Sequence, residues 1–350
     1  MRADLPPAIA SAIETCVQPT LLFDRARLVA NMHAFVASGA TVLFAAKSFP
    51  HPEVWQLAAA TCAGFDVASV GELAALPATS LVSVADPTGR AGDVARAARV
   101  IVSCESAAQV ARAPANAEIA IRLSSSYGHR DPAVGAVLDG NGHRRSRFGV
   151  ETEDELRAIA DAARGRRLGL HVHHGPVTAG SGERFASTVR DALARAAGLE
   201  IAFLDVGGAW HGVADVGAAI ATVRAAVPAS IELIVEPGRA IAREAGFAVG
   251  RVVAARELAD RMLRIVDLSR LGHLRWSPIE LVGAAPHAGT GRNVLVVGPT
   301  CSEDDVVGEW TITPALLAVG ERFIVRGVTG YAVAWNTPFG GVPAADIRIV

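Results

Sequence analysis

The sequence predicts an α/β protein in which a (β/α)8 barrel is followed by an antiparallel β domain, and two observations support this prediction. Between residues 41 and 236, short apolar runs rich in β-branched residues alternate with longer segments of helical period. Such runs are typical of parallel strands that are buried on both faces. After Arg243, the helical segments give way to short Val, Ile and Leu runs broken by Gly and Pro, which favours an antiparallel domain.

Eight apolar runs are the candidate strands, and eight strands over about 200 residues fit a (β/α)8 barrel. A doubly wound sheet is the alternative, but it usually has a glycine-rich turn after its first strand. Here the first run leads into AAKSFPHP instead. The strands are predicted at 41–46, 65–69, 81–85, 100–103, 118–123, 168–173, 201–206 and 231–236, and helices between them at 52–61, 71–76, 106–112, 152–164, 185–197 and 216–226.

The change of pattern sets the domain boundaries. We assign residues 27–243 to the barrel and residues 244–350 to the β domain. The apolar run Thr20–Phe23 precedes the barrel, and we expect residues 1–26 to add a strand to the β domain.

Composition and charge argue against several classes of protein. The chain has 350 residues, enough for two domains with cores of their own, and its net charge of −2 gives no sign of a nucleic-acid or membrane-surface partner. No apolar run reaches the ~20 residues of a membrane span, and Met1–Ala10 lacks the pattern of a secretory signal. The four cysteines lie far apart without the spacing of a metal site, so we expect free thiols, no bound metal and a cytoplasmic location.

Lysine is unusually rare in this chain. Of its 33 basic residues, one is Lys47 and the other 32 are arginines. A guanidinium forms no imine near neutral pH, whereas a lysine amine does. The composition alone is equally compatible with a surface lysine that survives by chance, but Lys47 directly follows the first predicted strand, where a functional group is expected.

The residues that end the predicted strands form an unusual set, because this end of a (β/α)8 barrel carries the functional groups. Lys47 follows the first strand, His173 ends the sixth, Gly207 and Gly208 follow the seventh, and Glu236 ends the eighth. Each residue by itself has a structural explanation, since histidines are often structural, glycines make turns and Glu-Pro stops a strand. Their coincidence at one rim predicts a functional site.

This set suits a phosphorylated aromatic cofactor that carries an aldehyde. The loops after strands seven and eight commonly bind phosphate in such barrels. Gly207, Gly208 and Gly238 let backbone N–H groups approach phosphate oxygens, and Arg239 adds a forked cation. Lys47 supplies the amine for the aldehyde. The ring then has two candidate partners, a stacking histidine (His173) and a carboxylate for a ring nitrogen (Glu236).

Eight segments of the chain are informative when they are taken together. They are FAAKSF (44–49), GFDVAS (64–69), SRFG (146–149), LHVHHG (170–175), LDVGG (204–208), EPGR (236–239), GPTC (298–301) and GY (330–331). In this order they resemble the fold-type III pyridoxal-phosphate decarboxylases, the group that contains ornithine, arginine and diaminopimelate decarboxylases. The resemblance spans nearly the whole chain and does not depend on a single motif.

The resemblance implies an alanine-racemase-like fold of type III, pyridoxal 5′-phosphate as cofactor and a homodimer with shared active sites. It implies that Lys47 holds the cofactor as a Schiff base, that His173 stacks on its ring and that Glu236 pairs with its ring nitrogen. Cys301 would enter from the partner subunit as a proton donor, although a lone cysteine is more usually an inert thiol. The residues implied to contact phosphate are Gly208, Gly238, Arg239 and Tyr331.

The chemistry of these residues favours decarboxylation of an amino acid. Loss of CO2 leaves electrons that an imine conjugated to a protonated pyridine takes up, and a carboxylate such as Glu236 raises the pKa of the ring nitrogen. Alanine racemases share the fold but have an arginine at that nitrogen. The small pyridoxal-phosphate homeostasis proteins resemble the barrel alone and lack the β domain.

The departures from the family pattern concern the substrate. The residue after the cysteine is normally an acid that meets the distal ammonium of a diamino acid. Here it is Ser302, and a second acid is replaced by the stretch 282–285. Burying an ammonium without a carboxylate is costly, although Glu303 is one acid that can supply the charge from a shifted position. Trp335, near Tyr331, suits an apolar, thioether or onium side chain, or belongs to the core.

Three hypotheses follow. The first is a dimeric amino-acid decarboxylase whose substrate is not a standard diamino acid. The second is an ornithine, lysine or diaminopimelate decarboxylase. The third, from another class, is a protein that binds the cofactor without turnover, which the intact set of Lys47, Glu236 and Cys301 disfavours.

Overall fold

The computed structural model describes residues 5–95, 97–124, 126–127, 144–173, 182–283, 291–313 and 317–350. The chain forms two compact units. The barrel unit consists of Ala30–Lys47 and Pro52–Ile241, and the β unit consists of Met1–Val29, Ser48–His51 and Ala242–Val350. None of the described helices is long and apolar enough to cross a membrane.

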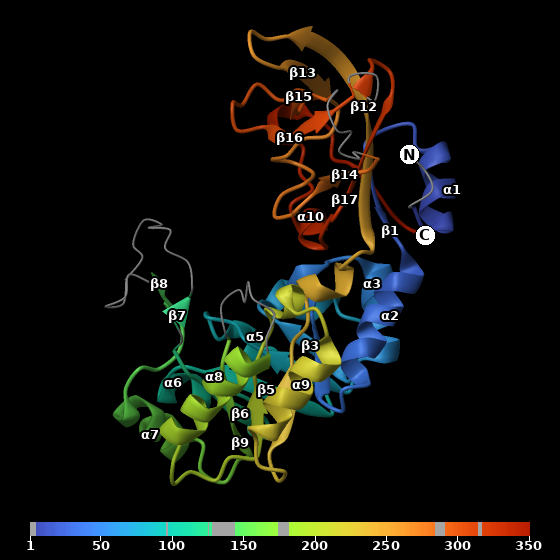
Figure 1. The fold of residues 1–350 in the computed structure, drawn as a ribbon. Coiled ribbons are helices and arrows are strands. Elements are labelled where there is room, and N and C mark those ends of the chain that lie inside the picture. The colour runs from blue at the N-terminus through green and yellow to red at the C-terminus, as the bar shows by residue number, and fades with distance from the viewer. Residues whose placement is uncertain are drawn as a thin grey trace. The chain divides into compact units, whose positions relative to one another are not determined.

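Eight parallel strands close the barrel unit, in the order β10-β11-β2-β3-β4-β5-β6-β9 (Figure 1). Most residues of these strands are buried on both faces, which explains their continuous apolar runs. Every predicted strand overlaps an observed one, so the predicted (β/α)8 fold is confirmed. The strands are β2 (Thr41–Ala45), β3 (Gly64–Val67), β4 (Leu81–Val84), β5 (Arg99–Cys104), β6 (Glu118–Arg122), β9 (Leu168–His171), β10 (Phe203–Asp205) and β11 (Glu232–Val235).

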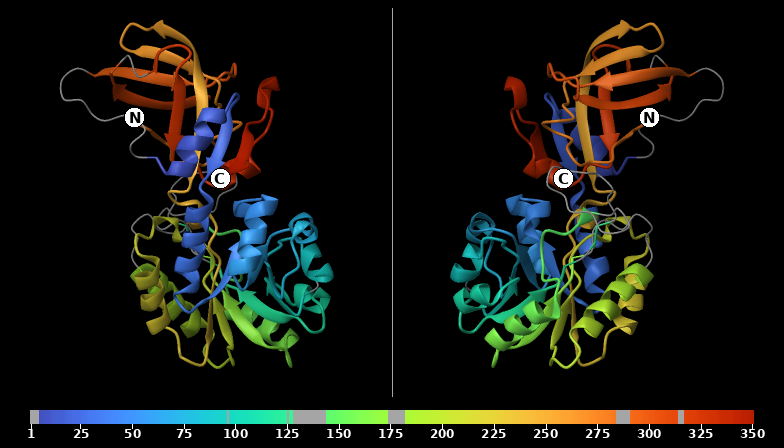
Figure 2. Two further views of the ribbon diagram at one scale, coloured as in Figure 1. Left: turned by 90° about the vertical axis from the view of Figure 1, so that its right-hand side faces the viewer. Right: turned by 90° about the vertical axis from the view of Figure 1, so that its left-hand side faces the viewer.

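The helices of this unit lie outside the strands (Figure 2). Capping side chains mark the first residue of several of these helices. Thr152 and Glu155 form a reciprocal capping box at α7, and the carboxylate of Asp215 caps α9. Two helices were not among the predicted ones, because α2 has apolar residues on several faces and α5 has only five residues. The helices are α2 (Arg25–Val36), which crosses the boundary between the units, α3 (Pro52–Thr61), α4 (Val70–Ala75), α5 (Arg90–Val94), α6 (Ala107–Arg112), α7 (Glu153–Ala162), α8 (Gly182–Arg195) and α9 (Val216–Ala225).

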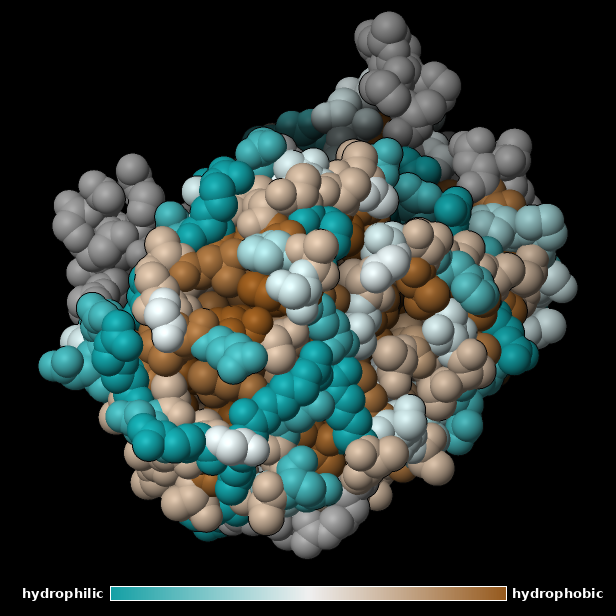
Figure 3. All heavy atoms as spheres, turned by 90° about the horizontal axis from the view of Figure 1, so that it is seen from below, coloured by the Kyte–Doolittle hydropathy of each residue, from teal (hydrophilic) through white to brown (hydrophobic). Residues whose placement is uncertain are grey.

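Charged side chains pair with one another at the end of the barrel where the strands begin. Arg99 donates hydrogen bonds of 2.8–2.9 Å to Glu118 and Glu232. Arg167 donates to the same two carboxylates at 2.7 and 2.8 Å, and the Thr41 hydroxyl donates to Glu232 at 2.7 Å. In the view from below, hydrophilic residues cross a hydrophobic area of this unit (Figure 3). An apolar cluster of barrel residues comprises Leu43, Leu81, Ile101, Ala120, Phe203 and Ile234.

The β unit contains a twisted sheet in the order β14-β17-β12-β13-β15-β16, with β1 between β12 and β18. The sheet is mixed, whereas the sequence pattern predicted an antiparallel one. The pairs β1–β18 and β13–β15 are parallel and the others are antiparallel. A short apolar run in the sequence does not show whether a strand pairs in parallel or antiparallel, because that direction depends on how the connections between strands run. The strands are β1 (Thr20–Phe23), β12 (Gly246–Glu257), β13 (Met262–Val266), β14 (Glu280–Leu281), β15 (Arg292–Val297), β16 (Val306–Ile312), β17 (Arg322–Arg326) and β18 (Asp346–Ile349).

The N-terminal segment forms part of the β unit. β1 pairs with β12 from Thr20 opposite Val249 to Phe23 opposite Gly246. Helix α1 (Pro7–Thr15), which the sequence analysis did not predict, has a proline in its first turn and buries Ile9 and Ile13. These side chains share an apolar cluster with Leu22, Phe247, Val249 and Ile324.

Candidate active site

Lys47 lies in a short 3-10 turn, η1 (Ala46–Ser48), immediately after β2. Its Nζ is 2.5 Å from Oδ2 of Asp66, whose side chain is fully buried, whereas 36% of the Lys47 side chain is exposed. Asp66 is on β3, opposite Ala45 of β2. The amine is therefore held at the end of the barrel where the strands stop. Asp66 was not among the predicted site residues, although an acid within an apolar strand is a signal for a functional role.

Two buried carboxylates lie beside one another at this rim, after the two strands that precede β2 in the barrel order. Asp205 ends β10 and Glu236 follows β11. Burial and the charge of Asp205 raise the pKa of Glu236 well above its usual value. Burial also raises the pKa of Asp205 to about 7. The hydrogen bond that Oδ1 of Asp205 accepts from the backbone N–H of Gly207 at 2.8 Å acts in the opposite direction and lowers this pKa. Two carboxylates this close favour a shared proton.

Several polar atoms at this end are buried without a hydrogen-bond partner among the described residues. They include Oδ1 of Asp66, Oε1 of Glu236 and Nε2 of His171. A buried polar atom left in this state costs about 1–3 kcal/mol. A ligand that brings hydrogen-bonding groups into this end would recover that cost.

His173 is half-buried and lies two residues beyond the end of β9. Burial and the nearby cations Lys47 and Arg122 lower the pKa of His173 to about 4, so the ring is neutral at neutral pH. A Cβ at Gly207 would lie 3.1 Å from the ring Cδ2 of His173, and one at Gly208 would lie 3.1 Å from the carbonyl oxygen of Glu236. Gly207 also has φ of +65°, which favours glycine. A side chain at Gly207 would therefore crowd the histidine ring, and one at Gly208 would crowd the backbone of Glu236.

The remaining barrel residues of the predicted site follow Glu236. The carbonyl oxygen of Pro237 accepts a hydrogen bond from the N–H of Ala45 at 3.2 Å, which ties the exit of β11 to the end of β2. Gly238 and Arg239 are half-buried, and Arg239 begins the 3-10 turn η3 (Arg239–Ala242). Seven of the predicted site residues are thus grouped at one end of the barrel unit, namely Lys47, His173, Gly207, Gly208, Glu236, Gly238 and Arg239.

The other predicted site residues belong to the β unit. Cys301 is an exposed free thiol in the turn between β15 and β16. Ser302 is half-buried and Glu303 is exposed. The turn is held by the buried carboxylate of Asp305, which accepts hydrogen bonds from the Thr300 hydroxyl at 2.8 Å and from other groups of the β unit. The geometry thus gives Asp305 a structural role in presenting Cys301.

Tyr331 and Trp335 lie in a small aromatic cluster of the β unit. Tyr331 begins and Trp335 caps the short helix α10 (Tyr331–Ala334). Trp276 makes edge contacts with both rings, at centroid distances of 5.2 and 5.4 Å. The guanidinium of Arg275 lies 4.4 Å from the centroid of the Trp335 ring. One face of Trp335 therefore already has a cation over it.

One further pattern at the barrel end admits two explanations. His171, Asp205 and Glu236 bring atoms that can bind metal to within 4.8 Å of one another. Such a trio is compatible with a cation, but a carboxylate with an open position also suits the ring nitrogen of an aromatic cofactor. Comparison with known proteins supports the second explanation.

The model of the family described as pyridoxal-dependent decarboxylase, pyridoxal binding domain, matches residues 25–243. The chain belongs to this family. It is similar to the diaminopimelate decarboxylase of Deinococcus radiodurans, with 28% identity over 344 residues that cover 90% of this chain and 86% of the relative. The diaminopimelate decarboxylase of Vibrio cholerae is 25% identical, with 95% and 87% of the two chains covered.

Solved structures of low sequence identity share the fold. The arginine decarboxylase of Paramecium bursaria Chlorella virus superposes with a TM-score of 0.79 at 16% identity, over 98% of this chain and 99% of that one. The lysine/ornithine decarboxylase of Vibrio vulnificus superposes with a TM-score of 0.75 at 20% identity, over 98% and 97%. The predicted family, fold and cofactor are thereby confirmed, and this decarboxylase is a pyridoxal-phosphate enzyme.

The barrel end fits this cofactor. The open oxygen of Glu236 suits a protonated ring nitrogen, the amine of Lys47 suits an aldehyde, and the crowded glycines Gly207 and Gly208 leave room for backbone contacts that a side chain would block. Trp210, two residues beyond Gly208, is a core residue. Its ring is buried and stacks on Phe185 at 4.1 Å.

Proposed function

We propose that this enzyme releases CO2 from an α-amino acid whose side chain is not a standard diamine precursor, at a site organised around Lys47. The observation that supports this proposal best is the position of the sole lysine. It lies at the strand-end rim of the barrel, paired with the buried Asp66 at 2.5 Å. An amine that can form an imine there has no competitor among the other side chains.

Pyridoxal phosphate supplies a conjugated system that accepts the electrons left by departing CO2. Lys47 would hold its aldehyde carbon, and Asp66 would orient the amine. The neutral ring of His173 would stack on the cofactor ring, and Glu236 would hold the proton of the ring nitrogen. The residues proposed for the phosphate are Gly207, Gly208, Gly238, Arg239 and Tyr331.

We infer a homodimer with shared sites, in which Cys301 of one subunit acts as proton donor for the other. Its thiol is exposed on a turn that Asp305 fixes, so it is available to a neighbouring chain. The free state of the four cysteines is consistent with a reducing compartment, and we propose the cytoplasm.

The substrate proposal rests on the residues around Cys301 and Trp335. Ser302 brings no charge to meet a distal ammonium, and Glu303 is exposed. Residues 284 and 285 of the other substituted stretch lie outside the described residues. Because Arg275 already covers one face of Trp335, we favour a thioether or apolar side chain over an onium. Trp335, Ser302 and Glu303 are the proposed substrate contacts.

Diaminopimelate is the second candidate substrate, because curated relatives over most of this chain are diaminopimelate decarboxylases. Ornithine and lysine are decarboxylated by the structural neighbours of lower identity, whose names refer to those amino acids. A protein that binds the cofactor without turnover is the remaining alternative. These possibilities predict different amino acids, or none, as sources of CO2.

A screen of CO2 release tests the substrate. Purified, cofactor-loaded enzyme is offered single amino acids, including methionine-like, methylated, aliphatic and dibasic ones together with diaminopimelate. We expect turnover of an apolar or thioether amino acid to exceed that of every dibasic one. Higher turnover with diaminopimelate, ornithine or lysine would replace the first proposal by the second, and no CO2 from any of them would favour the protein without turnover.

Mixing two inactive variants tests the shared site. Lys47→Ala and Cys301→Ala chains are mixed under conditions in which subunits exchange, as verified by mass. In a random mixture about half of the dimers are heterodimers with one intact site each, so activity should return to about a quarter of wild type. If exchange occurs and no activity returns, Cys301 serves its own subunit or has no role in proton transfer.

A further inference from the structure

His171 is a buried histidine for which the proposed function has no role. It ends β9, and its side chain is 2% exposed. Its Nδ1 lies 2.8 Å from the hydroxyl of Ser103, near the end of β5. Its Nε2 faces Oε2 of Glu236 at 3.8 Å and has no hydrogen-bond partner among the described residues. The ring is thus fixed on one side and open toward the carboxylate on the other.

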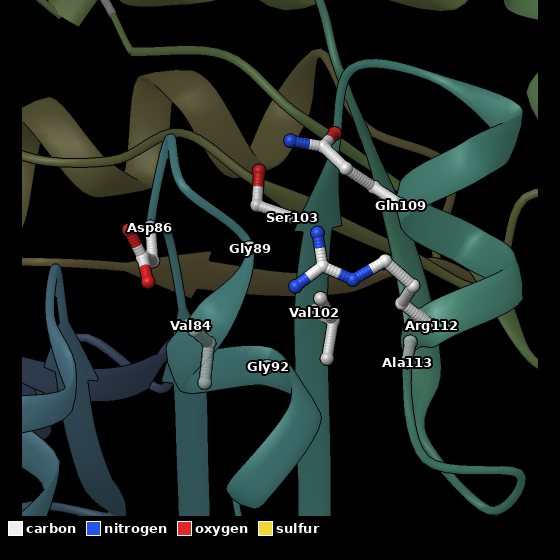
Figure 4. Close-up of a pocket in the computed structure, with 9 residues that line it drawn as sticks. All are labelled: Val84, Asp86, Gly89, Gly92, Val102, Ser103, Gln109, Arg112 and Ala113. Carbon is white, nitrogen blue, oxygen red and sulfur yellow. The ribbon is translucent and has the colours of Figure 1, made fainter.

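The surroundings of Ser103 indicate which nitrogen of His171 carries the proton. Ser103 and Gln109 both line a small hollow between β4, β5, α5 and α6 (Figure 4). The amide oxygen of Gln109 accepts a hydrogen bond from the N–H of Glu105 at 2.5 Å, so its NH2 group, a donor, is left for the hollow. The Ser103 hydroxyl has Nδ1 of His171 as its one side-chain hydrogen-bond partner among the described residues, so it can give its proton to that nitrogen. On the other side of the ring, an ionised Glu236 carboxylate is an acceptor only. This arrangement puts the imidazole proton on Nε2, toward Glu236.

The charges around His171 keep its ring neutral. Burial lowers its pKa well below the usual value, and Arg122, His173 and Lys47 lower it further. A neutral imidazole donates one hydrogen bond and accepts one. With Nδ1 as the acceptor, the single N–H of the ring faces the carboxylate of Glu236.

We propose that His171 is a positioning residue that donates its Nε2 proton in a hydrogen bond to Glu236 and, locked in this tautomer by Ser103, keeps that carboxylate ionised and aligned for the ring nitrogen of the cofactor. The inference rests on the proposed role of Glu236. The contact of 3.8 Å closes to a hydrogen bond with a small side-chain rotation, since such bonds commonly tighten only when a ligand is bound. A hydrogen-bonded partner of this kind fixes the orientation of a functional group and tunes its basicity.

The direct test is the protonation of the cofactor's ring nitrogen. The enzyme is loaded with pyridoxal phosphate carrying nitrogen-15 in the ring, and the nitrogen chemical shift is followed by NMR across neutral and mildly alkaline pH. In the wild type we expect the shift of a pyridinium throughout this range. His171→Phe keeps a ring but removes both nitrogens, so its signal should move toward neutral pyridine at lower pH. His171→Gln returns an N–H donor and should restore most of the wild-type signal.

Ser103 provides a milder variant at the same site. Ser103→Ala removes the hydroxyl that fixes the tautomer of His171, so it should move the signal of the cofactor's ring nitrogen in the same direction by a smaller amount. Ser103→Thr retains the hydroxyl and should behave as wild type. These variants also answer the case in which His171→Phe fails to fold. An unchanged ring-nitrogen signal in a cofactor-loaded His171→Phe or Ser103→Ala enzyme would overturn the inference.

A cofactor analogue separates this role from a purely structural one. With pyridoxal phosphate, His171→Phe should lower kcat by about ten- to a hundredfold and leave KM nearly unchanged. With the analogue in which CH replaces the ring nitrogen, wild type and variant should turn over at the same low rate. An equal loss with both cofactors would mean that His171 only supports the fold.

The same measurement distinguishes a failure of this inference from a failure of the proposed function. If Glu236→Gln leaves the ring-nitrogen signal unchanged, the proposed role of Glu236 is wrong. If Glu236→Gln moves the signal and His171→Phe does not, the role of Glu236 stands and only the inference about His171 fails.

Discussion

The two ends of the barrel interior use the same kinds of side chain in opposite ways. Where the strands begin, Arg99 and Arg167 each bind both Glu118 and Glu232, and Thr41 adds a further hydrogen bond. Charge balances charge there, and the hydrogen bonds are made within the protein. This end is complete without a ligand.

Where the strands stop, acids outnumber their partners. Asp66 pairs with Lys47, but Asp205 and Glu236 are buried beside each other, and the charge of Asp205 raises the pKa of Glu236. Buried oxygen atoms of Asp66 and Glu236 lack partners among the described residues. A structure carries such a cost where another molecule completes the hydrogen bonds. Both ends of the barrel carry charged side chains, so charge does not distinguish them. The end that binds the cofactor is distinguished by buried polar atoms whose hydrogen bonds are not made within the protein.

A matched pair of Glu→Gln substitutions tests this contrast and has the largest expected effect. Glu236→Gln should lower decarboxylation about a hundredfold or more, because a preorganised charge at the ring nitrogen is lost. Glu232→Gln makes the same chemical change at the other end and should leave kcat of the folded enzyme unchanged. The measurement is kcat at saturating cofactor for both variants. Equal losses would remove the distinction between the two ends.

The same two variants should rank in the opposite order for stability. Glu232→Gln breaks an ion-pair network that is partly exposed to solvent, and because solvent screens such pairs it should cost about 2 kcal/mol of unfolding free energy or less. Glu236→Gln removes one of two neighbouring acids and should not lower the stability of the cofactor-free protein. Urea unfolding of both cofactor-free proteins measures this. A larger loss for Glu236→Gln would contradict the account of its burial.

The two ends should also respond oppositely to pH. The hydrogen bonds from Arg99 and Arg167, working against partial burial, lower the pKa of Glu232 from 4.5 to about 2, so its stabilising contribution is present above pH 4.5 and is lost as pH falls toward 2. Burial raises the pKa of Asp205 from 3.8 to about 7, so its contribution becomes unfavourable as pH rises from 3.8 toward 7.

Unfolding of the cofactor-free protein followed against pH separates these contributions. Asp205→Asn should remove part of the stability loss between pH 4 and 7, and Glu232→Gln should flatten the acid limb below pH 4.5. Each variant serves as the control for the other. An Asp205→Asn profile parallel to wild type over that range would mean that Asp205 is already ionised in the folded protein.

The smallest predicted effect concerns Gly208, at the barrel end where the strands stop. A Cβ at Gly208 would press on the carbonyl of Glu236 at 3.1 Å, so Gly208→Ala should weaken cofactor binding by about tenfold. Gly217→Ala, in helix α9 with ordinary contact distances, is the control and should leave the Kd unchanged. Fluorescence titration with pyridoxal phosphate compares the two, and equal Kd values would mean that Gly208 does not border the cofactor.

The sequence predicted more of the barrel end where the strands stop than of the end where they begin. Lys47 and Glu236 were predictable because each follows an apolar run, so strand geometry alone brings them to one rim. Asp66, His171 and Asp205 were not assigned roles, since a polar residue inside a strand gives no sign of which neighbour it meets. Their importance depends on contacts between strands.

The ion-pair network at the end where the strands begin was not predictable for a related reason. Arg99 and Glu232 are 133 positions apart and belong to strands that are not neighbours in the barrel order. No spacing rule relates them. The mixed direction of strands in the β unit was hidden similarly, because β1 and β18 pair in parallel from opposite ends of the chain.

The central claim is that Lys47 is the residue that binds the cofactor, and chemical trapping tests it most directly. Enzyme loaded with pyridoxal phosphate is reduced with borohydride, digested and mapped by mass spectrometry. The account predicts loss of the visible absorbance and a stable pyridoxyl adduct on Lys47, with none on Lys47→Ala. The chain has one lysine, so the N-terminal amine is the only competing primary amine in the unmodified protein. An adduct at the N-terminus, or visible absorbance that survives in Lys47→Ala and is still trapped by borohydride, would contradict the claim.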